Sequence, residues 1–366
     1  ISRMDKMRNR RLNERINSGH RLLSFCILCL FVLYVAGSSA EEQSQRERSK
    51  SKVVLLHTDN LTYDQYRHPG AQILTGNVQF QHDGVLMYCD SACFYEATNS
   101  FDAFGHVKMV QGDTLDLVGD MLLYNGMEQL ARVRHNVILT HRESKLYTDS
   151  LDYDRLYELG YFFEGGKLVD KDNVLISDWG QYSPPTRQAV FNYNVQLENP
   201  RFTLISDTLN YNTRTSMAEI VGPSNIDSGD NHIYSESGFY NTQTEQAILL
   251  DRSIVTNKGR KMVGDSLFYD SKTGIGEGFR NVVYTDEVNK NMLTGNYCYY
   301  NDSLGYSMAT DSAVAIDFSQ RDTMYMHADT FKVYTFHIDT DTMYREMRAY
   351  HKVRSYRTDV QSVCDS

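Results

Sequence analysis

The sequence predicts an all-β protein, an elongated stack of tandem repeats of about 29 residues. Its 366 residues include 26 Tyr but only 5 Pro, a composition that favours strands. A short motif returns at nearly constant spacing, and the apolar residues around it alternate with period two, as in strands with one buried face. No amphipathic helical pattern of useful length occurs between residues 53 and 336.

The net charge of the chain is −10, from 37 basic and 47 acidic residues. A nucleic-acid-binding surface needs clustered positive charge, so we expect no nucleic acid partner. Beyond residue 40, no apolar run approaches the roughly 20 residues of a membrane-spanning helix.

The first 40 residues have the three parts of a secretory signal. Five arginines between Arg8 and Arg21 precede an apolar run over 22–36, and the small residues 37–40 follow it. We therefore predict export, with cleavage after Ala40; an uncleaved anchor is the alternative, although the run is short for one. Residues 41–52 are charged and featureless, as in a linker.

The repeating motif consists of an acidic residue, usually Ser or Thr, an apolar residue, any residue and an aromatic residue. Asp149-Ser-Leu-Asp-Tyr153 and Asp265-Ser-Leu-Phe-Tyr269 are typical copies. Successive copies are separated by 30, 29, 29, 29, 29, 29 and 31 residues, a series that chance does not produce. Their first residues are Asp90, Asp120, Asp149, Asp178, Asp207, Glu236, Asp265 and the weaker Asn296.

A second landmark, Asn followed by Val or Ile, precedes most copies, as in Gly76-Asn-Val78 and Arg280-Asn-Val282. Turn-forming residues follow each aromatic residue of the acidic motif. We therefore expect each repeat to supply a strand, a further strand at the Asn-Val landmark, a loop, a strand at the acidic motif and a turn. Stacked repeats bury one continuous core. With one strand per sheet from each repeat, two facing sheets of nine strands would extend about 43 Å, at ~4.8 Å per strand.

Enzymatic and metal-binding constellations are missing from the sequence. It has no Gly-x-Ser-x-Gly elbow, no phosphate-binding loop and no His-Glu-x-x-His motif, and its histidines lack metal spacing. Gly274-Ile-Gly-Glu-Gly278 lies between expected strands without a following helix, so we interpret it as a turn and bulge. We assign no catalytic residue, no metal ligand and no cofactor.

The repeated side chains have structural explanations. An acidic residue that recurs in each unit is expected to be structural, because a catalyst needs a unique place, although a glycosidase carboxylate pair stays open. The tyrosine column is expected to pack between strands, with a sugar-binding platform as the alternative. Cys89, Cys93, Cys298 and Cys364 do not make a disulfide scaffold, and pairing of Cys298 with Cys89 or Cys93 stays open.

The order and spacing of several short motifs resemble the OstA-like family. This is the LptA-type family of lipopolysaccharide transport proteins, in its Bacteroidetes form, and the resemblance spans about residues 53–336. It implies an elongated open β-jelly-roll, with two facing, mostly antiparallel sheets, an apolar interior and no catalytic residues. The motifs are Gly76-Asn-Val78, Met87-Tyr-Cys-Asp-Ser-Ala92, Ala103-Phe-Gly105-His-Val107 and Gln111-Gly-Asp-Thr114.

The resemblance also implies a periplasmic carrier that binds lipopolysaccharide and passes it toward the outer membrane. Exposed acyl chains cost ~0.8 kcal/mol per methylene group, so lipid A needs an apolar groove to cross water. Sheet edges recruit further strands, so we predict end-to-end assembly with other jelly-roll transport proteins or with copies of this chain. We expect the groove to be lined by Val78, Phe80, Val107, Met109, Leu122, Val137, Leu139, Leu151, Val195, Leu197 and Leu209.

Three other interpretations stay open on the sequence. An exported carbohydrate-active or adhesive parallel β-helix also has short repeating coils, and a passive surface scaffold needs no ligand. Residues 337–366 end in Val363-Cys-Asp-Ser366, which resembles Tyr88-Cys-Asp-Ser91, so we expect a further repeat cut mid-unit. The chain would then also fit the N-terminal part of the outer-membrane translocon.

Overall fold

Extended strands dominate the computed structural model, which describes residues 51–64, 66–301, 303–337 and 343–365. Within these residues the single helical element is a 3-10 turn, η1 (Glu96–Thr98). The predicted all-β class is therefore confirmed. The described part contains no helix with the length and apolarity needed to cross a membrane. The predicted signal, and nearly all of the predicted linker, lie outside the described residues.

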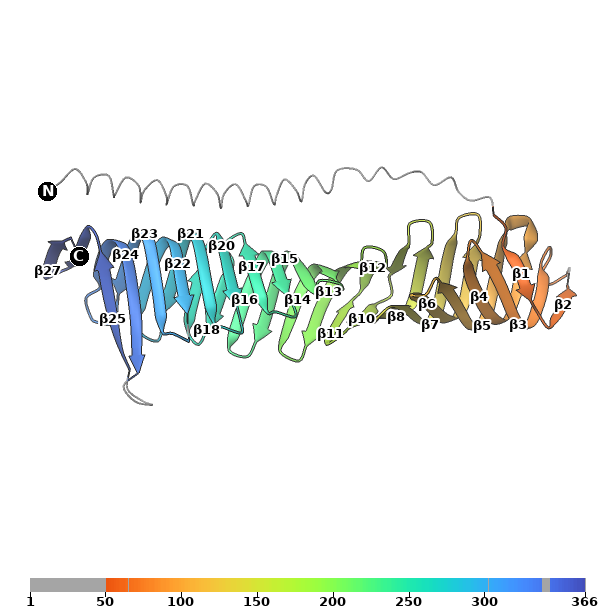
Figure 1. Cartoon of the computed structure of the whole chain (residues 1–366), viewed down its shortest axis with the longest axis horizontal. Coiled ribbons are helices and arrows are strands. Elements are labelled where there is room, and N and C mark those ends of the chain that lie inside the picture. The colour runs from red at the N-terminus through yellow and green to blue at the C-terminus, as the bar shows by residue number, and fades with distance from the viewer. Residues whose placement is uncertain (1–50, 65, 302, 338–342, 366) are drawn as a thin grey trace, which may run out of the picture. The chain divides into compact units, whose positions relative to one another are not determined.

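The strands follow one another along the stack in chain order (Figure 1). The first half comprises β1 (Val54–His57), β2 (Asn60–Tyr63), β3 (Gln72–His82), β4 (Val85–Tyr95), β5 (Ser100–Gln111), β6 (Leu115–Asn125), β7 (Leu130–His141), β8 (Ser144–Asp154), β9 (Leu159–Phe162), β10 (Gly166–Asp170), β11 (Asn173–Ser177), β12 (Trp179–Ser183), β13 (Gln188–Asn199) and β14 (Phe202–Asn212). The second half comprises β15 (Met217–Ser228), β16 (Asn231–Asn241), β17 (Gln246–Leu250), β18 (Ile254–Asn257), β19 (Arg260–Val263), β20 (Ser266–Asp270), β21 (Ile275–Asp286), β22 (Asn291–Asn301), β23 (Tyr306–Asp317), β24 (Met324–His337), β25 (Met343–Tyr350), β26 (Val353–Arg357) and β27 (Val360–Cys364).

Strand pairing is antiparallel throughout the described residues, and one hydrogen-bonded sheet connects the strands. Tight turns join consecutive strands, so most pairs are neighbours in sequence. A parallel β-helix, which needs parallel pairing between successive coils, is therefore wrong for this chain.

The Asn-Val landmark is a bend within a strand. In β3, two consecutive left-handed residues, Gly76 (φ 84°) and Asn77 (φ 49°), interrupt the register between Thr75 and Val78. Such a bulge bends a strand and increases its twist. The residues before and after it therefore belong to two different parts of the sheet, which we call leaf 1 and leaf 2. Residues 72–75, 91–95, 100–104 and 121–125 lie in leaf 1, and residues 78–82, 85–89, 107–111 and 115–118 lie in leaf 2.

This bend corrects the expected strand count. Each repeat supplies two long strands, and both cross the bend, so the repeat adds two strands to each leaf rather than one. A repeat therefore lengthens the stack by ~9.6 Å, twice the value expected from the sequence. The expectation failed because the Asn-Val landmark was taken as the start of a strand, whereas the same strand begins several residues earlier.

Side chains of the acidic motif bond to the bend of the next strand. Asn136 donates to Asp120 (Nδ2–Oδ2 2.6 Å), and Asn194 donates to Asp178 in the same way (2.6 Å). Gly105 (φ 75°) packs so tightly that a Cβ there would lie 2.4 Å from Asp90 Oδ2. These contacts give the acidic residues the structural role that the sequence predicts.

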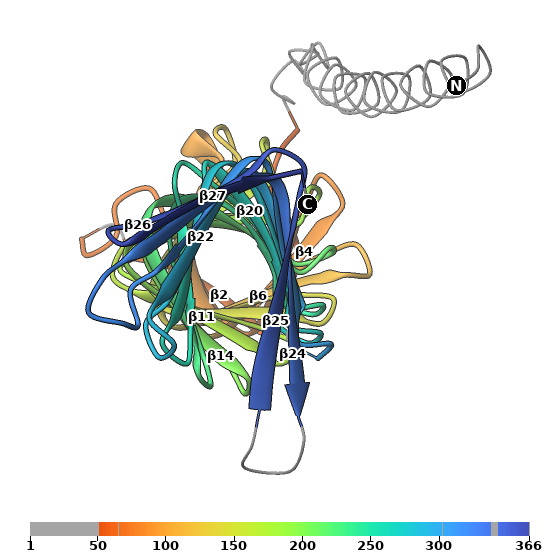
Figure 2. The same cartoon turned by 90° about the vertical axis from the view of Figure 1, so that its left-hand side faces the viewer.

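The bulge also keeps one face of each strand turned inward on both leaves. In β6, Leu115 and Leu117 are buried before the bend, and Leu122 and Tyr124 are buried after it. The alternation of β6 shifts by one position between Gly119 and Leu122, whereas the bulged strand β5 has one more residue at the bend and keeps its alternation from Ala103 to Val107. Viewed along the stack, the strands wrap around a common interior (Figure 2). The inward-facing apolar side chains of the successive strands form one buried cluster there.

Candidate functional site

The apolar interior between the two leaves is the candidate functional site. Buried apolar side chains form one cluster that extends from Val53 to Val353. All eleven residues predicted to line a groove belong to this cluster, and each is between 0% and 2% exposed. The structure thus brings them together on the inward faces of the strands. Their contact with lipid stays a prediction.

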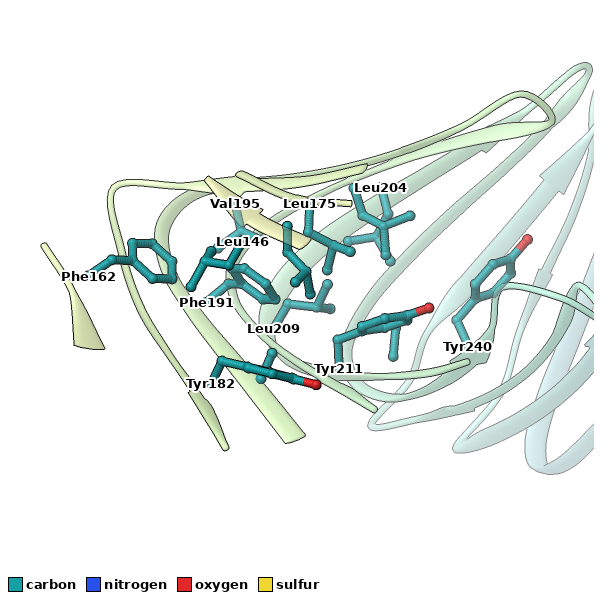
Figure 3. Close-up of a cluster of buried hydrophobic side chains, with 14 of the residues drawn as sticks. Leu146, Phe162, Leu175, Tyr182, Phe191, Val195, Leu204, Leu209, Tyr211 and Tyr240 are labelled. Carbon is teal, nitrogen blue, oxygen red and sulfur yellow. The ribbon is translucent and has the colours of Figure 1, made fainter. Parts of the chain in front are cut away.

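Over most of its length this interior is filled by the chain's own side chains. Phe80 of leaf 2 stacks on Phe101 of leaf 1, with ring centroids 4.1 Å apart, and Phe101 contacts Tyr124 at 5.2 Å. Figure 3 shows the same filling farther along, where Leu146 and Leu175 lie beside successive aromatic residues. None of the eleven predicted residues lines the cavity between β19 and β25 described below.

Tyrosines of the acidic motif join the two leaves on the side opposite the bend. In five of them the hydroxyl reaches from leaf 1 to a polar side chain at the end of a leaf 2 strand, whereas Tyr153 and Tyr240 have no such partner among the described residues. We call these contacts the tyrosine bridges. They are Tyr124–His82 (2.7 Å), Tyr182–His141 (2.8 Å), Tyr211–Asp170 (2.8 Å), Tyr269–Asn231 (2.8 Å) and Tyr300–Arg260 (2.8 Å).

The first bridge is part of a buried polar cluster. His82 is 1% exposed, and its Nδ1 shares a hydrogen bond with the Tyr124 hydroxyl. Arg155, 8% exposed, donates to that hydroxyl. Burial lowers the pKa of His82 below its ordinary value of 6.5, so the imidazole is neutral at pH 7. Protonation would add a second positive charge beside Arg155.

The third bridge is centred on a buried carboxylate. Asp170, 1% exposed, accepts hydrogen bonds from Tyr211 (2.8 Å) and from Ser144 (2.8 Å). Asn173 donates to the Tyr211 hydroxyl (2.9 Å) and to Thr242 (3.0 Å). Burial and the neighbouring Asp170 raise the pKa of Tyr211, so it stays a hydrogen-bond donor. A buried carboxylate needs such donors to offset its desolvation.

The interior opens into a cavity of about 320 Å³ between β19 and β25. Leaf 2 supplies Leu293, Ala315 and Met326, and leaf 1 supplies Val333 and Met347. Met347 is 39% exposed, so the cavity reaches the protein surface. Tyr284, Met292, Tyr300, Tyr306 and Thr335 also line it.

A charged group lies at this cavity. Arg345 of β25 and Arg260 of β19 both line it, and both contact Asp286 (Arg345 Nη1–Asp286 Oδ2, 3.0 Å). Burial alone would raise the pKa of Asp286, but hydrogen bonds from Asn289 and Arg345 hold it below its usual value. Arg345 therefore joins leaf 1 to leaf 2 here by a charged contact.

Small inward-facing residues explain why the interior is open at this place. Ala313 and Ala315 occupy the positions that Val78 and Phe80 occupy in β3, two and four residues after the first left-handed residue of the bend. Of these two alanines, Ala315 lines the cavity, whereas Ala313 is completely buried. Smaller side chains leave space that the opposite leaf does not fill. The sequence carries this signal, but our sequence analysis missed it.

Other chemical features of the described residues have plain structural roles. No cluster of His, Cys, Asp and Glu there could hold a metal ion. The thiols of Cys89 and Cys298 are free and buried, and burial raises the pKa of each to about 12, so they are unreactive at neutral pH. Gly274 (φ 66°) forms a turn before β21, in agreement with the prediction.

Comparison with known proteins identifies the family. The OstA-like protein family matches residues 50–207 and 201–265, together more than half of the 366 residues. The chain belongs to the OstA-like family. No curated protein matches it. Among solved structures, this OstA-like chain is similar to LptH of Pseudomonas aeruginosa, an LptA-homologous periplasmic component of the lipopolysaccharide transport device. The identity is 17%, the TM-score is 0.28, and the match covers 30% of this chain and 82% of LptH.

The predicted membership is therefore confirmed, and the all-β architecture agrees with it. Membership in the OstA-like family supports a role in lipopolysaccharide transport.

Proposed function

We propose that this OstA-like chain is a periplasmic carrier that shelters the acyl chains of lipopolysaccharide between its two leaves and passes the lipid toward the outer membrane. The observation that carries the proposal is the continuous apolar interior of the sheet, from Val53 to Val353. It offers shelter along the whole stack, while polar groups of a ligand stay outside, beyond the tyrosine bridges.

The filled interior must part to accept a lipid, and the energies favour this. A 14-carbon acyl chain gains about 10 kcal/mol on burial, at ~0.8 kcal/mol per methylene group. A hydrogen bond contributes about 0.5–1.5 kcal/mol net, or about 1.5–3 kcal/mol when one partner is charged, so opening two or three tyrosine bridges costs less than burying one acyl chain returns. The displaced core side chains would then contact the lipid instead of one another and would lose little apolar burial.

Hand-off to a partner would use the edges of the sheet. Among the described strands, β2 (Asn60–Tyr63) pairs only with β3, and its residues are exposed. An unpaired strand edge can accept a strand from another protein. Other lipopolysaccharide transport proteins, or copies of this chain, are the partners we propose.

A photocrosslinking experiment in cells tests the carrier function. A photoreactive phenylalanine analogue at Phe80 replaces a buried ring by one of similar shape, and the same analogue at the exposed Gln81 is the matched control. We expect lipopolysaccharide adducts at Phe80 and not at Gln81. Absence of adducts at Phe80, and likewise at Phe101 and Phe191, would contradict the carrier function.

A further inference from the structure

The cavity between β19 and β25 is an opening that already exists in the apolar interior. A second cavity, of about 480 Å³ beside Leu115 and Tyr153, is lined mainly by polar and charged residues. Upstream, inward residues such as Phe80 and Leu209 are completely buried by the opposite leaf. At the cavity, Met326 and Val333 are only partly buried, and about 320 Å³ between them is unfilled. An alkyl chain that enters here displaces no core side chain.

The volume and the lining of the cavity fit one alkyl chain. Small-ligand pockets range over about 300–1,000 Å³, so this cavity is at the lower end and does not hold the several chains of a whole lipid A. Three of its lining residues are Met292, Met326 and Met347, whose flexible side chains adapt to chains of different shape.

The closure of the two leaves is also different at the cavity. Upstream, the bridges Tyr124–His82 and Tyr211–Asp170 join side chains that are each at most 2% exposed. At the cavity, the leaves are joined by the Tyr300–Arg260 bridge and by the contact of Arg345 with Asp286, and the side chains of Arg260 and Arg345 are 26% and 23% exposed. Water reaches this contact, so separating the two charges costs less than breaking a fully buried bridge.

We propose that the cavity between β19 and β25 is the loading site, which takes a single acyl chain of a lipid before the bridged interior upstream opens. This inference rests on the proposed carrier function and adds the position and the capacity of the first binding step. Binding then starts at this cavity and extends into the neighbouring interior as the adjacent bridges open.

The position of the bound chain can be measured by tryptophan quenching in the full chain. The single Trp, Trp179, lies in β12, far along the stack from β21 (Figure 1). In β12 the inward positions are the buried Gly180 and Tyr182, so the alternating Trp179 faces outward. Trp179→Phe combined with Tyr284→Trp moves the fluorophore to the cavity wall. A brominated 16-carbon fatty acid is the probe. We expect saturable quenching at one chain per protein in this variant and none in the parent.

A filling substitution tests whether the cavity itself holds the chain. Ala315→Phe, added to the fluorescent variant, places a ring in the cavity, and Val314→Phe places the same ring on the opposite face of β23. We expect Ala315→Phe to weaken probe binding about tenfold or more, the factor that two unburied methylene groups produce. Val314→Phe should leave it unchanged. Met326→Trp, which fills the cavity from the neighbouring strand, replaces Ala315→Phe if that variant does not fold.

The outcomes separate the loading site from the carrier function. No quenching in the Tyr284→Trp variant, or equal binding with and without the filling substitutions, would refute the loading site even if lipopolysaccharide crosslinks to Phe80 in cells. Quenching without such crosslinks would leave the acyl-chain site in place and refute the carrier function. Competition by lipid A, phosphatidylethanolamine and unbranched fatty acid then identifies the lipid that supplies the chain.

Discussion

Replacing Tyr211 by Phe tests whether the tyrosine bridges hold the two leaves together. The substitution keeps the buried ring and removes the hydroxyl that donates to Asp170 (2.8 Å). Asp170 is 1% exposed and keeps Ser144 as a donor, and Asn173 keeps Thr242 as an acceptor. The change therefore removes one hydrogen bond to a buried charge and one between neutral groups.

The expected loss of stability follows from those two contacts. A hydrogen bond to a charged group contributes about 1.5–3 kcal/mol. Because Asp170 is buried, no water molecule replaces the donor that the substitution removes. We expect Tyr211→Phe to destabilise the chain by about 2 kcal/mol. Tyr153→Phe is the matched control, because Tyr153 occupies the same motif position, is equally buried and has no hydrogen-bond partner for its hydroxyl in the described part of the chain. Its effect should stay within about 0.5 kcal/mol.

The assay is urea denaturation followed by circular dichroism, with the midpoint and the slope both reported. A double-mutant cycle with Asp170→Asn isolates the contact, and its coupling energy should be at least about 1 kcal/mol. If Tyr211→Phe is no more destabilising than Tyr153→Phe, or if the two substitutions are additive, the tyrosine bridges do not hold the leaves together.

Three further predictions concern the buried histidine and the backbone. Burial lowers the pKa of His82 from 6.5, so the unfolded state binds more protons than the folded state in mild acid, and the free energy of unfolding should fall as the pH decreases below about 6.5. In thermal melts at several pH values, His82→Gln should flatten this decrease. An unchanged pH dependence would contradict a buried neutral imidazole. Asn194→Ala should cost about 1–2 kcal/mol in urea, because Asn194 is left-handed (φ 52°) and bonds to Asp178, and Asn194→Gly should cost less; equal costs would show that the conformation is unimportant. Gly180→Ala would place a methyl group 2.4 Å from Phe162 Cζ and should cost about 1–3 kcal/mol by calorimetry, unless this part of the core adjusts freely.

Much of the fold could be predicted from the sequence because the signals are local. The alternation at Leu122 and Tyr124 correctly indicates a shared inward face, and the repeat spacing correctly indicates a stack. The bend at Asn77 was misplaced, because an Asn-Val pair after Gly suits the start of a strand as well as a bulge inside one. The strand count per leaf was wrong for that reason alone.

The candidate site depends on pairs of residues that are distant in sequence. His82 meets Tyr124 across 42 positions, and Asp170 meets Tyr211 across 41. The intervals exceed one repeat, so no motif within a repeat signals them. Similarly, the sequence shows only that Ala315 is a small residue, and not that it lines a cavity. The cavity exists because Val333 and Met347 of the opposite leaf do not fill the space beside Ala315.

The sequence by itself therefore determined the strand class, the repeat, the family and the inward face of each strand. Side-chain direction in a strand is a property of neighbouring residues and needs no knowledge of the partner leaf. Only the tertiary structure decided that one folded sheet forms both leaves, which polar groups join them, and where the interior stays open. Those features depend on which side chains of the two leaves face one another and on whether their combined volume fills the interior. Both are defined only once the sheet has folded on itself.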